Sequence, residues 1–304
     1  MKALVTKTTG LWYEVKSDTA IHVARLRGKF KLENKKTTNP IAVGDWVTIE
    51  PNGATKNEWV ITGIHERENY IVRQSPRKKG HDHLIASNVD QALIFFTFKS
   101  PRTSIGFIDR VLVTLEAYRI PAIILLNKTD LYSQEELDNW AQLTTVYEQL
   151  GYRVVKTSLS ENQIDLSKLL AKKTTLLVGH SGTGKSTLIN QTVSEVSQAT
   201  SEISSFADKG IHTTTFAEMF FIDEATSLID TPGIKELGLA EVQPEELDHY
   251  FPEMRSRLGQ CKFHDCQHTE EPKCAIKQAV EEGEIAFFRY ESYLSMLLGE
   301  DNRR

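Results

Sequence analysis

Cysteine is scarce in this sequence. Only three of the 304 residues are cysteine, and all three lie between residues 261 and 274. Disulfide frameworks use more cysteines, spread along small secreted domains. An odd and clustered set therefore argues against a disulfide scaffold and indicates a metal site.

Long apolar runs are also lacking. No stretch approaches the ~20 apolar residues that cross a bilayer, and residues 1–7 contain no extended apolar segment typical of secretory signals. We therefore expect a cytoplasmic protein without a membrane partner. At roughly 100–150 residues per domain, the length allows about two or three domains.

A strong net charge is the third missing feature. The formal charge is −5, which gives no overall nucleic-acid signal. Residues 1–75, however, hold 12 lysines and arginines against 8 aspartates and glutamates. This imbalance suits a local phosphate-binding face, although ordinary solvated surface explains it equally well.

Short strand signals fill the first 70 residues. Turn residues separate five stretches that we predict as strands, at residues 3–6, 11–15, 21–26, 45–49 and 59–64. Five such strands favour a small closed barrel resembling the oligonucleotide-binding (OB) fold. Basic residues cluster at and after the third strand: Arg25, Arg27, Lys29, Lys31, Lys35 and Lys36. Four aromatic residues are candidates for base stacking, but we expect at least half to be barrel core: Trp12, Tyr13, Phe30 and Trp46.

The strongest motif is Gly179-His180-Ser181-Gly182-Thr183-Gly184-Lys185-Ser186-Thr187. It fits G-x-x-x-x-G-K-[ST], the phosphate-binding loop of nucleoside triphosphatases, and the alternative is a Gly/Ser-rich surface turn. Glycines let consecutive backbone N–H groups approach a phosphate chain closely. We predict that Lys185 reaches the β- and γ-phosphates and that Ser186 binds Mg²⁺.

Alternating strands and helices surround this loop. We predict strands at residues 92–98, 121–126, 153–157, 174–178, 216–222 and 226–229. We predict helices at residues 108–118, 135–150 and 187–196. This α/β pattern predicts a mainly parallel sheet with helices on both faces and with ligands at the carboxyl ends of the strands.

A guanine-reading motif follows the second of these strands: Asn127-Lys128-Thr129-Asp130, which matches N-K-x-D. The Asp130 carboxylate can accept both N1–H and N2–H of guanine, which adenine does not offer. Asn127 would fix the turn or contact the base, and Lys128 would cover the base. Ser158 ends the next strand, in a segment resembling the element whose backbone N–H groups meet the guanine carbonyl.

Two switch motifs follow the phosphate loop. Asp230-Thr231-Pro232-Gly233 fits D-x-x-G, in which Asp230 holds Mg²⁺ through water and the Gly233 N–H meets the γ-phosphate. A threonine about 30 residues after the loop lysine fits switch I. Thr213, Thr214 and Thr215 all qualify, and Thr214 is the first choice as Mg²⁺ ligand; a threonine-rich strand entry is the alternative.

The group that orients the attacking water is not evident. Ile234 stands where many GTPases place a glutamine, and isoleucine cannot polarise water, so we predict slow intrinsic hydrolysis. His212, a backbone group or a bound partner would then supply activation. A structural or solvent-exposed role is the alternative for His212.

The clustered cysteines form the pattern Cys261-x₄-Cys266-x-His268-x₅-Cys274. Three thiolates and one imidazole suit one closed, four-coordinate structural Zn²⁺. Three coincidental thiols, or His264 in place of His268, are the alternatives. The surrounding region is predicted as helical, at residues 244–250, 274–282 and 285–298.

The motifs occur in an unusual order, because the base motif precedes the phosphate loop, which precedes the switches. Ordinary GTPases begin with the phosphate loop, so this order indicates a circular permutation. We predict an OB-like RNA-binding barrel (1–72), a circularly permuted GTPase domain (73–236) that opens with a basic connector (73–83), and a helical zinc-binding domain (237–304).

The combination resembles the RsgA family of small ribosomal subunit biogenesis GTPases, over essentially the whole chain. Residues 85–91 and 210–215 match as well, whereas Ile211 and Leu159 depart from the usual family residues. The resemblance implies GTP hydrolysis stimulated by the small ribosomal subunit, binding to its ribosomal RNA, and a role in late subunit maturation. It also implies Mg²⁺ with GTP at residues 127–130 and 179–187, and zinc at the Cys/His cluster.

Two other functions remain open at this point. One is an RNA-binding or chaperone module with a mainly structural nucleotide site, which intact Lys185, Ser186 and Asp230 disfavour. The other is an ATPase. We expect a monomer that binds GTP or GDP.

Overall fold

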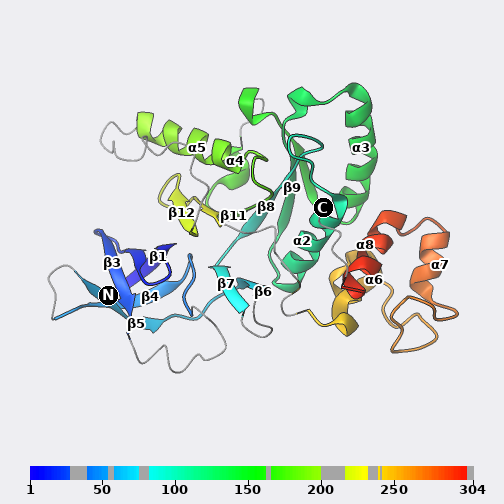
Figure 1. The fold of residues 1–304 in the computed structure, drawn as a ribbon, viewed down its shortest axis with the longest axis horizontal. Coiled ribbons are helices and arrows are strands. Elements are labelled where there is room, and N and C mark those ends of the chain that lie inside the picture. Colours follow the sequence, from blue (N-terminus) through cyan, green and yellow to red (C-terminus); the bar gives the residue numbers. More distant parts are fainter. Residues whose placement is uncertain are drawn as a thin grey trace.

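The structure is a computed structural model of the chain. It describes residues 1–27, 40–53, 58–74, 82–161, 166–199, 216–231, 239 and 242–299. Figure 1 shows a β-barrel at one end, an α/β unit in the middle and a small helical unit at the other end.

Five strands form the barrel: β1 (Lys2–Thr8), β2 (Tyr13–Lys16), β3 (Ile21–Leu26), β4 (Trp46–Pro51) and β5 (Trp59–Ile64). They pair in the order β1-β2-β3-β5-β4, and β4 returns to β1, which closes the barrel. Val5, Val15 and Ile61 are fully buried inside it. This pairing confirms the predicted five-stranded barrel. The barrel forms because apolar residues alternate along its strands and pack into one small core.

A two-stranded sheet follows the barrel. It consists of β6 (Tyr70–Gln74) and β7 (Asp82–Ser87), which pair antiparallel. The ends of the predicted basic connector, residues 73–83, therefore belong to strands, and residues 75–81 lie outside the described part of the chain. The strands were missed because polar and charged residues interrupt their apolar alternation.

The central sheet is mainly parallel, as predicted. Its strands are β8 (Gln91–Phe96), β9 (Ala122–Leu126), β10 (Arg153–Lys156), β11 (Thr174–Val178), β12 (Glu218–Phe221) and β13 (Ser227–Asp230). Their order is β10-β9-β8-β11-β13-β12, and only β12 among them runs antiparallel to its neighbour. Strand β1 pairs with β12, so barrel and central strands form one continuous sheet.

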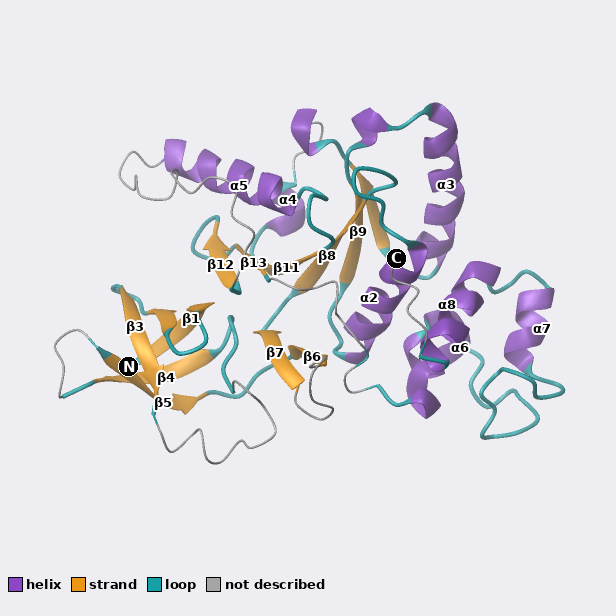
Figure 2. Ribbon diagram, in the orientation of Figure 1, coloured by secondary structure: helices purple, strands orange, loops and turns teal. Residues whose placement is uncertain are grey.

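Helices cover both faces of this sheet (Figure 2). They are α2 (Ile105–Ala117), α3 (Gln134–Gln149), α4 (Ser167–Leu170) and α5 (Lys185–Ala199). Strand β8 is buried on both faces: Ile94 and Phe96 pack into the core under α2 and α3, whereas Leu93 and Phe95 pack into the core under α4 and α5. An apolar strand without alternation is expected where helices cover both sides.

The helical unit contains the 3₁₀ helix η4 (Pro244–Tyr250), α6 (Pro252–Arg255), α7 (Ala275–Glu281) and α8 (Phe287–Leu297). The helix predicted at residues 244–250 is therefore a 3₁₀ helix, bounded by Pro244 and, after Phe251, by Pro252. Among the described ranges, no helix is both long and apolar enough to cross a membrane.

A fully buried arginine joins the helical unit to the central unit. Arg289 of α8 contacts Asp109 of α2 at 2.6 Å and Glu253 of α6 at 2.7 Å. Tyr147 of α3 donates to the same Asp109 oxygen at 2.8 Å. Since unpaired buried charges are costly, this network fixes α6 and α8 against α2 and α3.

Candidate functional site

Four sequence motifs meet at one rim of the central sheet. The base motif follows β9, Ser158 follows β10, the phosphate loop follows β11, and Asp230 ends β13. Neighbouring parallel strands place their carboxyl ends at the same rim. The structure thus brings together segments that are separated by up to about 100 residues in the chain.

Asn127 joins the base motif to the phosphate loop. Its side chain is buried; its Nδ2 donates to the Thr183 carbonyl oxygen at 2.8 Å, and its Oδ1 accepts from the Leu159 N–H at 3.1 Å. Gly184 leaves the space for this contact, because a Cβ there would lie 2.2 Å from Asn127 Nδ2. Its φ of +113° also favours glycine.

The Asp130 carboxylate is held by the neighbouring strand end. Its Oδ1 accepts a hydrogen bond from Ser158 Oγ at 2.5 Å, and Ser158 Oγ lies 2.9 Å from Ser160 Oγ. The Leu159 N–H donates to Asn127, so this backbone group, which the sequence assigned to the base, contacts a side chain in the structure.

Lys128 reaches a loop that the sequence analysis did not single out. The residue has a left-handed backbone with φ of 64°, and its ammonium donates to the Ser100 carbonyl oxygen. Ser100 follows β8, which lies between β9 and β11 in the sheet. The loop carries no motif, so only the strand order places it at the rim.

The phosphate loop is compact. The Lys185 ammonium donates to the carbonyl oxygens of Gly179 at 2.8 Å and His180 at 2.9 Å. A Cβ on Gly179 would lie 2.8 Å from Phe95 Cβ, so the loop needs glycine there. Helix α5 begins at Lys185 and points its amino end at the rim, an arrangement that favours anion binding.

The residues predicted for the switches are only partly described. Asp230 is buried at the end of β13 and lies opposite Leu177 of β11, two residues before Gly179. Six other predicted residues lie outside the described part of the chain: His212, Thr213, Thr214, Thr215, Gly233 and Ile234.

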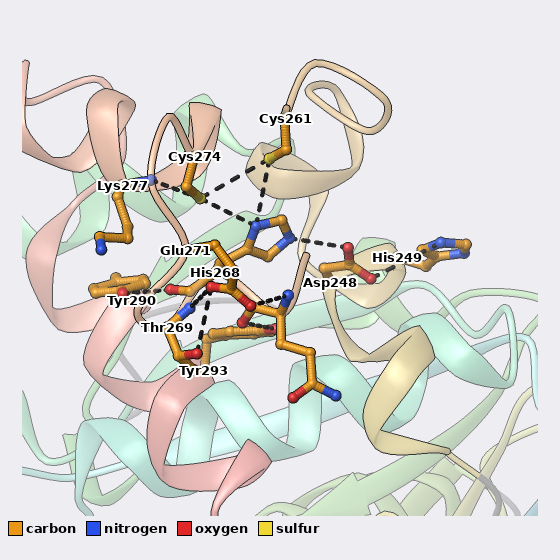
Figure 3. A network of polar contacts seen from close by, with 11 residues as sticks. Asp248, His249, Cys261, His268, Thr269, Glu271, Cys274, Lys277, Tyr290 and Tyr293 are labelled. Carbon is orange, nitrogen blue, oxygen red and sulfur yellow. Dashed lines mark hydrogen bonds and ion pairs between the residues drawn. The ribbon is translucent and has the colours of Figure 1, made fainter. Parts of the chain in front are cut away.

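A second site lies in the helical unit, where Cys261, Cys266, His268 and Cys274 place one ligand atom each within 4.8 Å of one another. Figure 3 shows three of them, Cys261, His268 and Cys274, facing one another. Cys261 Sγ and Cys274 Sγ are 3.9 Å apart, and His268 Nδ1 lies 3.3 Å from Cys274 Sγ. A tetrahedral zinc with Zn–S bonds of about 2.3 Å separates its sulfurs by about 3.8 Å. The donors therefore fit a tetrahedral metal ion, and His268 rather than His264 completes the described cluster.

Asp248 supports this cluster from η4. Its Oδ2 lies 3.1 Å from His268 Nε2, which leaves Nδ1 facing the thiols (Figure 3). Burial disfavours the charged imidazole, but the hydrogen bond with Asp248 and the charge of Cys261 outweigh burial and raise the pKa of His268. Carboxylates commonly orient metal-binding histidines in this way. Sequence analysis missed Asp248 because it precedes His268 by 20 residues without a motif.

Two of the predicted stacking rings lie outside the barrel core, Trp12 half-buried and Trp46 exposed. The Arg25 guanidinium lies 3.5 Å from the centre of the Trp12 ring, and Trp46 is 38% exposed beside the Lys2 ammonium. Of the three rings in the described part of the chain, Tyr13 alone belongs to the barrel core, and the expectation that at least half of the four are core stays a prediction. Phe30 and the lysines at 29, 31, 35 and 36 lie outside the described residues.

Comparisons with known proteins cover the whole chain. Residues 64–240 match the RsgA GTPase family and residues 2–57 match the RsgA N-terminal domain. The chain is 50% identical to the small ribosomal subunit biogenesis GTPase RsgA of Cytophaga hutchinsonii, covering 100% of both sequences. It is 45% identical to the protein of that name from Bacteroides fragilis, covering 98% of this chain and 96% of the relative.

Two solved structures are similar along the full length. The crystal structure of YjeQ from Thermotoga maritima has a TM-score of 0.75 and 34% identity, and the match covers 100% of this chain and 99% of the other. YloQ, described as a circularly permuted GTPase, has a TM-score of 0.70 and 30% identity, and the match covers 100% and 96%. The permuted order of motifs is therefore shared with a solved relative.

Proposed function

The chain belongs to the RsgA family and is a GTPase, and we propose that its GTP hydrolysis assists late maturation of the small ribosomal subunit. The similarity to small ribosomal subunit biogenesis GTPases supports this biological role. The observation that carries the nucleotide assignment is the Asn127 side chain, which binds the phosphate loop and the Ser158 segment at once. One nucleotide can then span the base motif and the phosphate loop.

We propose that the base is guanine. Asp130 accepts the two N–H groups of the base edge, and its hydrogen bond from Ser158 fixes the carboxylate for that bidentate contact. Asn127, Lys128 and Thr129 complete the binding site on the β9 side. An adenine presents an acceptor at N1 and would meet the carboxylate with repulsion.

The triphosphate is assigned to residues 179–187. Their backbone N–H groups and the amino end of α5 supply fixed positive dipoles. Lys185 turns from the carbonyl oxygens of Gly179 and His180 to the β- and γ-phosphates. Ser186, Asp230 and Thr214 would hold Mg²⁺, which would neutralise charge that develops on the phosphate oxygens.

Catalysis is assigned to the switch residues. The Gly233 N–H contacts the γ-phosphate, Thr214 senses Mg²⁺, and His212 is the candidate for orienting water. Because the Ile234 side chain has no polar atom to hold water, intrinsic turnover is slow and the small subunit stimulates it.

The remaining parts have proposed roles in docking. We assign residues 1–72 to RNA binding, 73–236 to the GTPase domain and 237–304 to a domain held by one structural Zn²⁺ on Cys261, Cys266, His268 and Cys274. A closed set of four protein ligands leaves no position for water, so this metal stabilises the fold. The protein works as a cytoplasmic monomer.

GTP turnover measured with and without purified small ribosomal subunits tests this function. We expect strong stimulation by the subunit and loss of turnover in Lys185→Ala. An unstimulated protein whose subunit maturation role survives Lys185→Ala would instead be an RNA-binding or chaperone module. Co-sedimentation with subunits in GDP and in a non-hydrolysable GTP analogue, at several salt concentrations, separates specific docking from general phosphate attraction.

Asp130→Asn tests the choice of base. The asparagine amide would move preference from guanine toward xanthine nucleotides. Unchanged preference, or preference for ATP in the original chain, would contradict the guanine assignment.

A further inference from the structure

The barrel holds strand β12 from both faces of the sheet. On one face the Lys7 ammonium lies 2.9 Å from Glu218 Oε1, and the two side chains are only 19% and 22% exposed. On the other face the Lys16 ammonium lies 3.8 Å from the centre of the Phe221 ring. The Thr8 N–H also donates to the Ala217 carbonyl oxygen at 3.2 Å.

The Lys7–Glu218 pair lies in register with Asp230 of the proposed nucleotide site. Lys7 lies opposite Glu218 in the β1–β12 register, and Glu218 lies opposite Asp230 in the β12–β13 register. Directly opposite residues point to the same face of a sheet. Lys7, Glu218 and Asp230 therefore form one row across three strands.

This row lies on the face covered by α5, the helix that starts at the phosphate-loop lysine. Leu177 lies opposite Asp230 on the next strand and packs in the core under α4 and α5. Phe220, two residues after Glu218, packs against the same core. The ion pair is thus on the same side of the sheet as the helix that carries Lys185 and Ser186.

We propose that Lys7 is a positioning residue for GTP hydrolysis. Through Glu218 it fixes the start of β12, and through β12 it fixes the β13 end that carries Asp230. Strand β12 has four residues and no other partner in the sheet besides β13 and β1 among the described strands. The side-chain pair therefore adds to the β1–β12 backbone pairing and the Lys16–Phe221 contact in holding this short strand to the barrel.

The proposal rests on the proposed role of Asp230 and makes a distinct prediction about sign. If Lys7 acts through position, Lys7→Met and Glu218→Gln both loosen β12 and both lower kcat. If the two side chains act only through their charges, the two changes alter the field at Asp230 in opposite directions, and their effects on kcat oppose each other.

Steady-state GTP hydrolysis by the full chain, without ribosomal subunits, is the test. We expect about a five-fold fall in kcat in both single variants, the upper range for a partly shielded ion pair, with a smaller change in KM. The exchanged pair, Lys7→Glu with Glu218→Lys, should recover most of the loss, and Lys7→Arg should resemble the original chain. Lys2→Met is the matched control, because Lys2 is on the same strand but contacts Trp46 inside the barrel unit.

Opposite effects of the two single changes, unchanged kcat in both, or a folded exchanged pair without recovery would each overturn the proposal. Thermal melting of every variant reports whether it is folded. If the exchanged pair does not fold, the comparison of kcat between Lys7→Arg and Lys7→Met tests the proposal instead. Asp230→Asn tests the proposed role of Asp230 itself. Full GTPase activity in Asp230→Asn would contradict that role. Loss of activity in Asp230→Asn would support it, and the Lys7 variants would then test the positioning proposal separately.

Discussion

Replacing Asn127 by alanine removes the hydrogen bonds between the base motif and its two neighbours. The Thr183 carbonyl oxygen and the Leu159 N–H would lose their buried partner. Each buried polar group left without a partner costs about 1–3 kcal/mol, so the folded state should lose ~2–6 kcal/mol. The same two contacts align the base and phosphate segments, and we therefore expect GDP to bind at least ten-fold more weakly, about 1.4 kcal/mol.

Urea unfolding and calorimetric titration with GDP measure these two losses. Asn127→Asp is a second test variant, of equal shape. Its carboxylate still accepts from the Leu159 N–H but faces the Thr183 carbonyl oxygen with a second acceptor, so it should be at least as damaging as alanine. If both variants keep the original free energy of unfolding and GDP affinity, the bridge has no energetic role and our account of the site is wrong.

Three further predictions concern the metal cluster, the buried arginine and a tyrosine near the base motif. Cys274→Ser should lower both the zinc content of the purified chain and its melting temperature, because Cys274 is both a cluster donor and the N-cap of α7. Zinc content is measured by atomic absorption, and an unchanged value would contradict the ligand set. Arg289→Met should cost ~3–5 kcal/mol of unfolding free energy, because it leaves buried Asp109 uncompensated, and adding Asp109→Leu should recover part of that cost in urea unfolding. Tyr132→Phe should cost about 1–3 kcal/mol, because the hydroxyl accepts from the Phe98 N–H and donates to the Asn127 carbonyl oxygen. Burial raises the pKa of Tyr132 from 10.0 to about 12, so the folded state retains a proton that the unfolded chain releases. The stability advantage of the original chain over Tyr132→Phe should therefore be full below pH 10 and should disappear as the pH rises through 12. An advantage that grows above pH 10 would refute this sign.

The sequence was sufficient for features that are local in the chain. The phosphate loop, the base motif and the cysteine cluster each span at most 14 residues, and their chemistry fixes their spacing, while the roles of their residues stay predictions. Strands β3, β5 and β11 have the predicted bounds because apolar alternation or an apolar run ends at turn residues. The common rim at which the motifs meet followed from the rule that parallel strands place their carboxyl ends at one edge of the sheet.

Features made by distant residues were not predictable in this way. Asp109 and Arg289 are 180 residues apart, and each alone reads as an ordinary polar residue on a helix. Asp248 and Ser100 likewise belong to no motif. Their roles come from how helices and loops pack, which a single sequence does not encode in any local period.

The pairing of β1 with β12 has a consequence for work with shortened chains. A chain without residues 1–64 would leave one side of β12 without its backbone partner, and exposed N–H and C=O groups of that kind recruit strands from other molecules. At the opposite edge of the sheet, β10 begins with Arg153 and ends with Lys156, and charged residues at an edge strand discourage pairing with strands of other molecules. An isolated GTPase unit is therefore expected to self-associate through β12, and its oligomers would say nothing about the intact protein.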